Sequence, residues 1–282
     1  MSIRSYHASH HGEMHWYNGK RHAHANAMDT IGSTLCYGPE YELDGFSWNT
    51  DLEAVSDELQ AALKDTDGRT LISCERDASL GHGFECVSFP ATLGCHRTSY
   101  GWRKFFDIVN ARGAGTGNNG MHVHASRAGL GTSERAQELC IAKIVYLLDT
   151  FTQTFGRIAG RSYARSRWCS CNSADIKKSD KSDLAIYKAK KTSYGDGHEN
   201  GTRYRALNLT NAATVEFRIF AVDYNFEHFL ARIEFCDWMI NTCKTHTFTD
   251  IYNWTSGDIK RMLTGLTDEK YTELKALAVE VL

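Results

Sequence analysis

The sequence predicts an α+β fold in which helices cover one face of an antiparallel or mixed β-sheet. Its 282 residues are 42% hydrophobic and 23% charged, a composition typical of folded globular chains. Segments with apolar residues at helical spacing lie between short stretches in which polar and apolar residues alternate. No internal repeat or linker divides the chain, which favours a single domain over residues 31–282 after a His-rich segment at residues 1–30.

Five helices are expected from the pattern of apolar residues. Thr50 and Glu53 form a capping-box pattern, and apolar residues then recur at helical spacing, so a helix is predicted over residues 51–65. The same spacing predicts four further helices, over residues 99–111, 133–155, 225–243 and 267–282.

Four strands are expected from alternation with a period of two, at residues 35–43, 120–125, 203–209 and 214–220. Apolar residues occupy one face of these segments, as in a sheet that helices cover on one side. If the strands are neighbours, their polar faces form one groove. Its side chains come in pairs that are two residues apart: Glu40 and Glu42, His122 and His124, Glu216 and Arg218.

The polar groove predicts a site for divalent cations and phosphate. Carboxylates that face one another destabilise each other unless cations neutralise them, and glutamate oxygens with imidazole suit Mg²⁺ or Mn²⁺ better than Zn²⁺. An arginine beside such ions can pair with phosphate oxygens, which indicates phosphoryl transfer. For any single pair, a solvated strand face is an adequate alternative, but three such strands in one chain favour the site.

Charge and composition limit the partners. The formal net charge is −2, no apolar run approaches the length of a membrane span, and the N-terminus lacks the pattern of a signal peptide. With nine cysteines in no repeated spacing, we expect a cytoplasmic protein with reduced thiols and no membrane partner. A basic polar insertion at about residues 157–202 could hold an acidic acceptor, and a solvated lysine loop is an equally good interpretation.

Several weaker signals receive no functional role. Residues 115–120 spell G-x-G-x-x-G, but they follow a predicted helix and precede a strand, the reverse of the dinucleotide-binding order. The N-terminal histidines match no tetrahedral zinc motif, so a flexible or packed tail is expected there. The two cysteines at positions 169 and 171 are too small a signal for a metal or redox site. Cys95 and His96 are adjacent in sequence, which says little about whether they could form a nucleophile pair.

Five ordered blocks, spanning about residues 35–240, resemble the amidoligases found in phage and bacterial genomes, relatives of glutamine synthetase. The blocks are YGPEYE at residues 37–42, ERDASL at 75–80 with GFECVSFP at 83–90, NGMHVHAS at 119–126, RYRALNL at 203–209 and TVEFRIF at 214–220. The resemblance implies the glutamine synthetase-like catalytic fold, a curved and largely antiparallel sheet with helices on one face. Its concave face would hold ATP and two or more Mg²⁺ or Mn²⁺ ions.

The resemblance also implies a set of metal ligands. Glu40, His122 and Glu216 would share the ion next to the phosphates, and Glu42 and Glu85 would hold the second ion.

The same resemblance assigns residues to the nucleotide and to the transferred group. His124 and Asn208 would lie near the nucleotide. Arg218 and Arg205 would contact the nucleotide and neutralise charge on the transferred phosphoryl group, with Arg203 a weaker candidate.

Two residues depart from the family pattern. Leu93 stands where glutamine synthetases carry a further metal-binding glutamate, so Asp77 could substitute in the catalytic site. Ala78 replaces the glycine that is usual in the D-G-S-L block, which affects the turn expected there.

The implied function is an ATP- and divalent-metal-dependent ligase that joins a carboxylate to an amine through an acyl-phosphate. The substrates would be small molecules or peptides, and a nucleic-acid-linked substrate has no support beyond the basic stretch. Alternatives are a phosphotransferase on the same fold and a non-catalytic relative that binds a polyanion. If the chain is phage-encoded, it would act in the host cytoplasm, and the sequence leaves the oligomeric state open.

Overall fold

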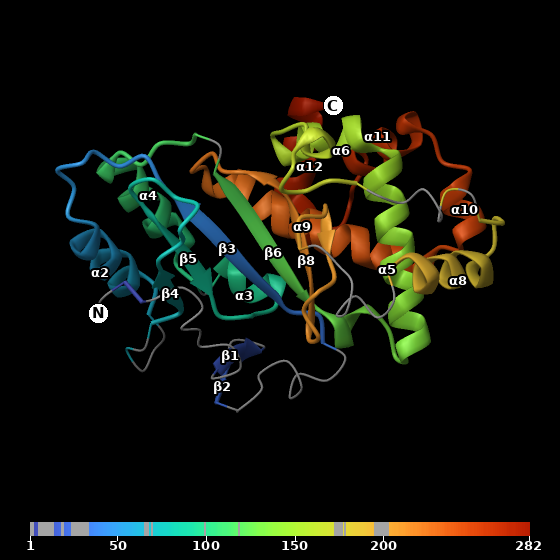
Figure 1. The fold of residues 1–282 in the computed structure, drawn as a ribbon, viewed down its shortest axis with the longest axis horizontal. Coiled ribbons are helices and arrows are strands. Elements are labelled where there is room, and N and C mark those ends of the chain that lie inside the picture. The colour runs from blue at the N-terminus through green and yellow to red at the C-terminus, as the bar shows by residue number, and fades with distance from the viewer. Residues whose placement is uncertain are drawn as a thin grey trace.

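A six-stranded antiparallel sheet forms the centre of the molecule (Figure 1). The computed structural model describes residues 3–4, 14–17, 20–23, 34–64, 68, 70–98, 100–117, 119–171, 177, 179–194 and 203–282. In sheet order the strands are β4 (Ile72–Glu75), β5 (Phe84–Ser88), β3 (Tyr37–Leu43), β6 (Gly120–Ser126), β8 (Thr214–Ala221) and β7 (Leu207–Asn208). A separate antiparallel pair consists of β1 (Met14–Tyr17) and β2 (Lys20–Ala23).

Helices cover one face of the sheet, behind the strands in Figure 1. The Tyr41 ring of β3 packs edge-on against Phe105 and Phe106 of α4 (Trp102–Arg112) and against Phe229 of α9 (Phe226–Thr245). Because Tyr41 alternates with Glu40 and Glu42, this packing directs both glutamates to the opposite face. The mixed α/β architecture with a one-sided helical layer confirms the coarse fold prediction.

A buried carboxylate ties the sheet to the helices. The hydroxyl of Tyr37 in β3 donates to Asp237 Oδ1 in α9 at 2.6 Å, and the hydroxyl of Tyr271 donates to Asp237 Oδ2 at 2.7 Å. Satisfied hydrogen bonds of this kind make a buried polar group tolerable in an apolar core. These hydrogen bonds hold β3 in a fixed position relative to α9.

The remaining helices surround this core. Among them, α2 packs on α4, and α5 and α12 pack on α9. The bounds are α2 (Leu52–Ala62), α3 (Leu93–Thr98), α5 (Glu134–Thr150), α6 (Thr152–Ala159), α8 (Asp183–Tyr194), α10 (Phe248–Tyr252), α11 (Ser256–Thr264) and α12 (Thr272–Val281), with 3₁₀ turns η1 (Arg127–Leu130), η2 (Tyr163–Arg165) and η3 (Glu269–Tyr271). None of the helices in the described part of the chain has the length and apolar character needed to cross a bilayer.

Several predicted elements differ from those observed. The N-cap of α2 is Asp51, whose carboxylate accepts from the backbone amides of Glu53 and Ala54, so the capping box at Thr50 was wrong. The helix predicted over residues 99–111 begins later, at Trp102, because Gly101 adopts a left-handed conformation with φ of 70°. The helix predicted over 133–155 is two helices, α5 and α6, separated at Phe151.

Strand β8 contains a β-bulge opposite His122. Met121 pairs with Phe220 and Val123 with Phe217, so two residues of β8, Arg218 and Ile219, oppose one residue of β6. The bulge keeps Arg218 on the polar face with Glu216 but turns Phe220 into the core, where it packs against α9. Strict alternation along β8 therefore ends at Arg218.

Candidate active site

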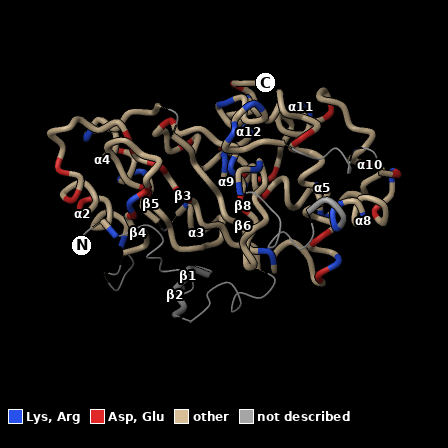
Figure 2. Tube along the Cα trace, in the orientation of Figure 1, with Lys and Arg blue, Asp and Glu red and all other residues tan. Residues whose placement is uncertain are grey.

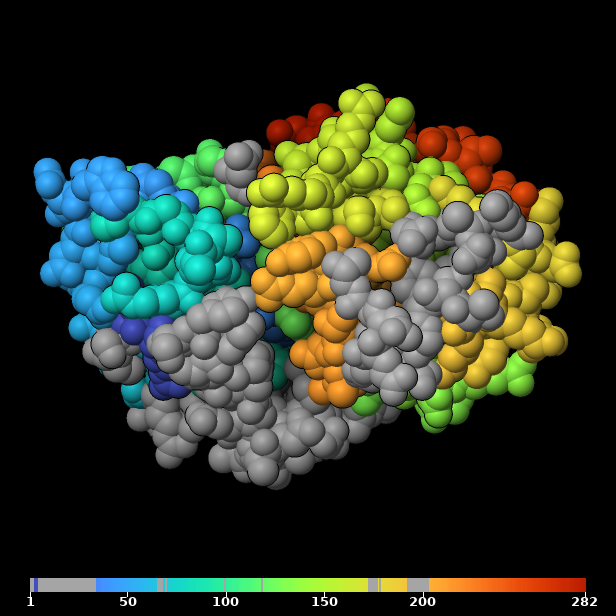
Figure 3. Space-filling model, in the orientation of Figure 1, coloured from blue at the N-terminus to red at the C-terminus, as the bar shows by residue number. Residues whose placement is uncertain are grey.

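A cavity of about 720 Å³ opens on the sheet face that the helices leave uncovered. Figure 3 shows this face hollowed between the cyan segment around β5 and the orange segment around β7 and β8, with the green of β6 at its floor. Acidic and basic positions both lie along these central strands in the tube view of Figure 2. The charged residues that line the cavity are Glu40, Glu42, Asp44, Glu75, Asp77, Glu85, Glu216, Arg161, Arg167, Arg203 and Arg218, with His122 and His124.

The register of the sheet brings the predicted metal ligands together. Glu40 lies opposite His122, and Glu42 lies opposite Glu85 on the other neighbouring strand. On the far side of β6, His124 lies opposite Glu216. Directly opposed side chains on one face are separated by about 5 Å between Cβ atoms, so the carboxylates and imidazoles contact one another.

Ligand atoms form three groups within which all atoms lie within 4.8 Å of one another. Each group combines side chains from at least two elements, and Glu40 and Glu85 each belong to two groups. Carboxylate oxygens with at most one imidazole are donors that suit a hard divalent ion. The groups are Glu40, His124 and Glu216; Glu40, Glu85 and His122; and Glu42, Asp77 and Glu85.

The grouping differs in detail from the one that the family resemblance implied. His124 lies among the possible ligands, with its Nε2 3.1 Å from Glu40 Oε1, and was expected near a nucleotide. Asp77 lies with Glu42 and Glu85, where a substitute for the absent family glutamate was expected. Leu93, at that absent position, begins α3 and packs into the core.

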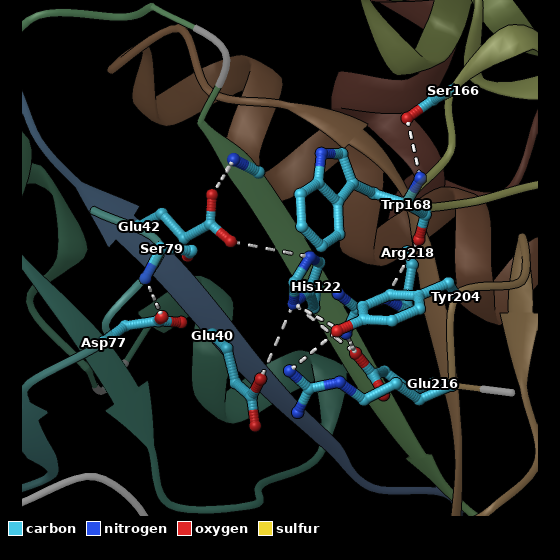
Figure 4. A network of polar contacts seen from close by, with 12 residues as sticks. Glu40, Glu42, Asp77, Ser79, His122, Ser166, Trp168, Tyr204, Glu216 and Arg218 are labelled. Atoms are coloured by element: carbon cyan, nitrogen blue, oxygen red, sulfur yellow. Dashed lines mark hydrogen bonds and ion pairs between the residues drawn. The ribbon is translucent and has the colours of Figure 1, made fainter. Parts of the chain in front are cut away.

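Hydrogen bonds hold the carboxylates in place around the imidazoles (Figure 4). His122 Nδ1 lies 3.4 Å from Glu216 Oε1 and 3.7 Å from Glu40 Oε2. Asn208, which the resemblance assigned to the nucleotide, donates from Nδ2 to Glu216 Oε2 at 2.6 Å. The backbone amide of Gly120 donates to Glu42 Oε2. These two hydrogen bonds fix the orientation of the Glu216 and Glu42 carboxylates.

The ionisation of the site divides it into two halves. Burial alone would raise the pKa of Glu40, but the imidazoles of His124 and His122 hold it well below its usual range. Burial likewise opposes charge on His124, and the carboxylates of Glu40 and Glu216 raise its pKa to about 9. For Glu85, burial and the negative charges of Glu40 and Glu42 act together and raise the pKa well above its usual range. The Glu85 end of the cavity is therefore a place where carboxylates oppose one another's ionisation.

Arg218 lies at the junction of the acidic groups. Its Nη1 donates to Glu216 Oε1 and lies 3.3 Å from His122 Nδ1, and its Nε lies 3.5 Å from the Trp168 carbonyl oxygen. The guanidinium of Arg161 donates to the carbonyl oxygens of Ile219 at 3.0 Å and Arg218 at 2.6 Å. Arg161 therefore fixes the backbone of the bulge that presents Arg218.

The three arginines predicted for the transferred phosphoryl group do not all meet. Arg218 and Arg203 line the cavity, but Arg205 lines a separate small pocket with Asp149 and Cys171. The strand predicted at residues 203–209 is paired only at Leu207 and Asn208, and Asn208 faces the cavity. Residues 203–206 precede the paired part of β7, so strand alternation does not place their side chains, and the position of Arg205 comes from the lining of the two pockets. The structure therefore does not bring Arg205 into the cavity with Arg218, and its role toward the phosphoryl group stays a prediction.

Among the cavity-lining residues to which sequence reasoning gave no site role, four are arginine or aromatic residues. They come from two stretches that lack the alternation of a strand, one of them after α6 and one before β7. A signal was nevertheless present, because each stretch contains an arginine directly followed by an aromatic residue. The missed residues are Arg161, Arg167, Trp168 and Tyr204.

The charges of the basic stretch are dispersed. Lys177 pairs with Asp149 at 3.3 Å, and the buried Lys190 pairs with Glu138. Residues 172–176, 178 and 195–202 of the stretch lie outside the described residues. Of the described basic residues, these two lysines pair with acids, whereas Arg161 and Arg167 line the cavity.

The signals that were set aside have structural roles where they are described. His96 is buried, its Nε2 lies 2.8 Å from the Tyr37 carbonyl oxygen, and burial lowers its pKa to about 4. Residues 115–120 connect α4 to β6, the order that excluded a dinucleotide fingerprint. Most of the N-terminal histidines lie outside the described residues.

Two comparisons with known proteins identify no relative of this chain. A scan against protein-family models gives no match, and a search of curated proteins finds no significant match.

Proposed function

We propose that this chain is an ATP-dependent carboxylate–amine ligase of the amidoligase type, with a glutamine synthetase-like catalytic fold and a requirement for Mg²⁺ or Mn²⁺. One observation carries the proposal. Carboxylates from β3, β5 and β8 converge with two histidines and Arg218 in a single cavity.

The donor atoms of the cavity fit divalent cations. Six carboxylates and imidazoles from four strands, together with Asp77, supply oxygen and nitrogen ligands at spacings that an ion can bridge. The raised pKa of Glu85 supports the same conclusion, because burial and the neighbouring carboxylates oppose its ionisation and a divalent ion bound there would favour it. We assign one ion to the group of Glu42, Asp77 and Glu85. We assign a second to Glu40 and Glu216 with a histidine.

The bound ions would neutralise the phosphate oxygens of ATP and orient the terminal phosphoryl group. Arg218 is placed beside this position and would stabilise the negative charge that develops during transfer, a contribution of a few kcal/mol for one well-placed donor. Asn208 and the Gly120 amide hold Glu216 and Glu42 in fixed orientations, so the ligands need no rearrangement as the charge develops.

The reaction would proceed in two displacements. A substrate carboxylate oxygen attacks the γ-phosphorus and ADP leaves, and the amine then attacks the carbonyl carbon of the acyl-phosphate and releases phosphate. The chain would contribute chiefly by positioning the reactants in a cavity of about 720 Å³.

Product analysis tests the proposal. The protein is incubated with Mg-ATP and pools of carboxylates and amines, and products are identified by mass spectrometry. A product that equals the two substrates less one water supports a ligase, whereas a product that has gained a phosphate supports a phosphotransferase.

A matched pair of variants assigns the activity to the cavity. Glu216→Gln should abolish ATP turnover, and Glu58→Gln, which removes an exposed carboxylate paired with Arg112, should leave it unchanged. Turnover that survives in both Glu216→Gln and Glu40→Gln would contradict the site assignment and favour a protein that only binds polyanions.

A further inference from the structure

Two arginine–aromatic pairs meet at the wall of the cavity opposite the carboxylates. The guanidinium carbon of Arg167 lies 4.6 Å from the centre of the Trp168 ring, and that of Arg203 lies 5.2 Å from the centre of the Tyr204 ring. The two rings contact each other edge to face, with centres 5.0 Å apart. All four residues line the cavity, and Figure 4 shows both rings beside His122 and Glu216.

The Trp168 side chain lines the cavity but remains exposed. Its exposed fraction is 42%, and the other large apolar residues with comparable exposure in the described part of the chain, Trp48, Leu184 and Val279, do not line the cavity. Burial of an indole ring is strongly favourable, so an indole left open within a concave site is suited to a ligand that covers it.

The backbone of Trp168 is held close to the phosphoryl-transfer residues. Its carbonyl oxygen lies 3.5 Å from Arg218 Nε, and its amide donates to Ser166 Oγ at 3.2 Å. The aromatic wall and the acidic cluster are therefore parts of one site, linked through Arg218.

We propose that Trp168 and Tyr204, with Arg167 and Arg203, form the subsite for the base of a nucleotide whose phosphates lie at the acidic cluster. This inference rests on the proposed function, which requires a nucleoside triphosphate in the same cavity. Aromatic rings stack on any base, and each stacked base contributes about 1 to 3 kcal/mol. The two guanidinium groups add cation–π contacts and attract the phosphates.

The chemistry of the wall favours a nucleotide over an acidic peptide. A carboxylate side chain would use the arginines but would leave the Trp168 ring uncovered, whereas a nucleotide offers both a flat π system and negative charge. A single nucleotide also fits better than a nucleic-acid strand, because both rings lie in one cavity of about 720 Å³, a volume usual for small-molecule sites.

Calorimetric titration with three probes in Mg²⁺ tests the subsite. The probes are a non-hydrolysable ATP analogue, inorganic tripolyphosphate, which lacks a base, and hexadeoxyadenylate. We expect the wild-type protein to bind the ATP analogue about 10- to 100-fold more tightly than tripolyphosphate. Trp168→Ala should remove this difference by weakening the analogue alone, and Trp168→Phe should retain part of it.

The matched control is Trp48→Ala. Trp48 is 79% exposed, stacks on His82 with ring centres 4.6 Å apart and lies outside the cavity lining, so its loss should leave all three affinities unchanged. Thermal unfolding establishes that each variant is folded, and Trp168→Phe provides the comparison if the alanine variant is not.

Different failures have different meanings. Equal losses of tripolyphosphate and analogue binding in Trp168→Ala, or no loss of either, would overturn the base subsite while the metal and phosphate site stands. Binding of hexadeoxyadenylate that depends on Trp168, with analogue binding that does not, would overturn it in favour of a strand. A wild-type protein that binds neither tripolyphosphate nor the analogue in Mg²⁺ would overturn the proposed function itself.

Discussion

Replacing Glu85 by glutamine should stabilise the metal-free protein and weaken its response to Mn²⁺. Glu85 is buried, and one of its carboxylate oxygens lies within 4.8 Å of oxygens of both Glu42 and Asp77. At an effective dielectric constant of about 20, two like charges at that separation repel by roughly 3.5 kcal/mol. Protonation of Glu85, whose pKa is raised by burial and by these charges, relieves part of the repulsion. We therefore expect Glu85→Gln to increase the free energy of unfolding by about 1 to 2 kcal/mol in EDTA.

Guanidinium chloride denaturation at pH 7, in EDTA and in Mn²⁺, measures both effects. At an ion concentration of 100 times its Kd, a bound ion stabilises the wild-type protein by about 2.7 kcal/mol. The variant should gain less because it has lost a carboxylate ligand, so that Mn²⁺ reduces or reverses its advantage.

The control for this experiment is Glu58→Gln, whose carboxylate pairs with Arg112 on the surface. Its difference from the wild-type protein should be the same in EDTA and in Mn²⁺. A Glu85→Gln protein that is less stable than the wild type in EDTA would refute the reasoning, as would a difference that Mn²⁺ leaves unchanged.

Three other substitutions test the supporting structure. Burial holds the pKa of His96 at about 4 against about 6.5 when unfolded, so stability present above pH 6.5 should fall by about 3 kcal/mol as the pH drops to 4. His96→Gln should remove this component from denaturation curves measured across that range, and an unchanged slope would contradict it. A Cβ on Gly83 would lie 1.9 Å from the Leu43 carbonyl oxygen, so Gly83→Ala should lower stability by about 2 kcal/mol or more, whereas Gly94→Ala, with open space around it, should not. Lys190→Met leaves the buried Glu138 with Arg127 at 3.6 Å as a partner and should cost about 3 kcal/mol by thermal or chemical unfolding, and the exposed Lys188→Met should cost little.

Alternation along the sequence was sufficient to predict the strands with one polar face. Glu40 and Glu42, and likewise His122 and His124, alternate with core residues, and the observed register places them on one side of the sheet. Alternation could not predict β4 and β5, because both faces of these short strands are buried. Glu85 was therefore identified only through the family resemblance.

Local irregularities account for most of the errors. The bulge at Arg218 and Ile219 changes the face of Phe220, and no feature of the residues themselves indicates an inserted position. Alternation could not place Arg205 either, because only Leu207 and Asn208 of the strand predicted at residues 203–209 are paired. Trp168 lies outside the helices and strands, so periodicity could not place it in the cavity wall, and the preceding Arg167 was the local signal that the pattern offered.

The most direct test of the account is anomalous diffraction from crystals grown with Mn²⁺ and a non-hydrolysable ATP analogue. We expect anomalous peaks bound by Glu42, Asp77 and Glu85 and by Glu40 and Glu216 with a histidine, with the phosphates between these peaks and Arg218. A cavity without manganese, in crystals that contain the ion at saturating concentration, would contradict the central claim that these carboxylates form a metal centre.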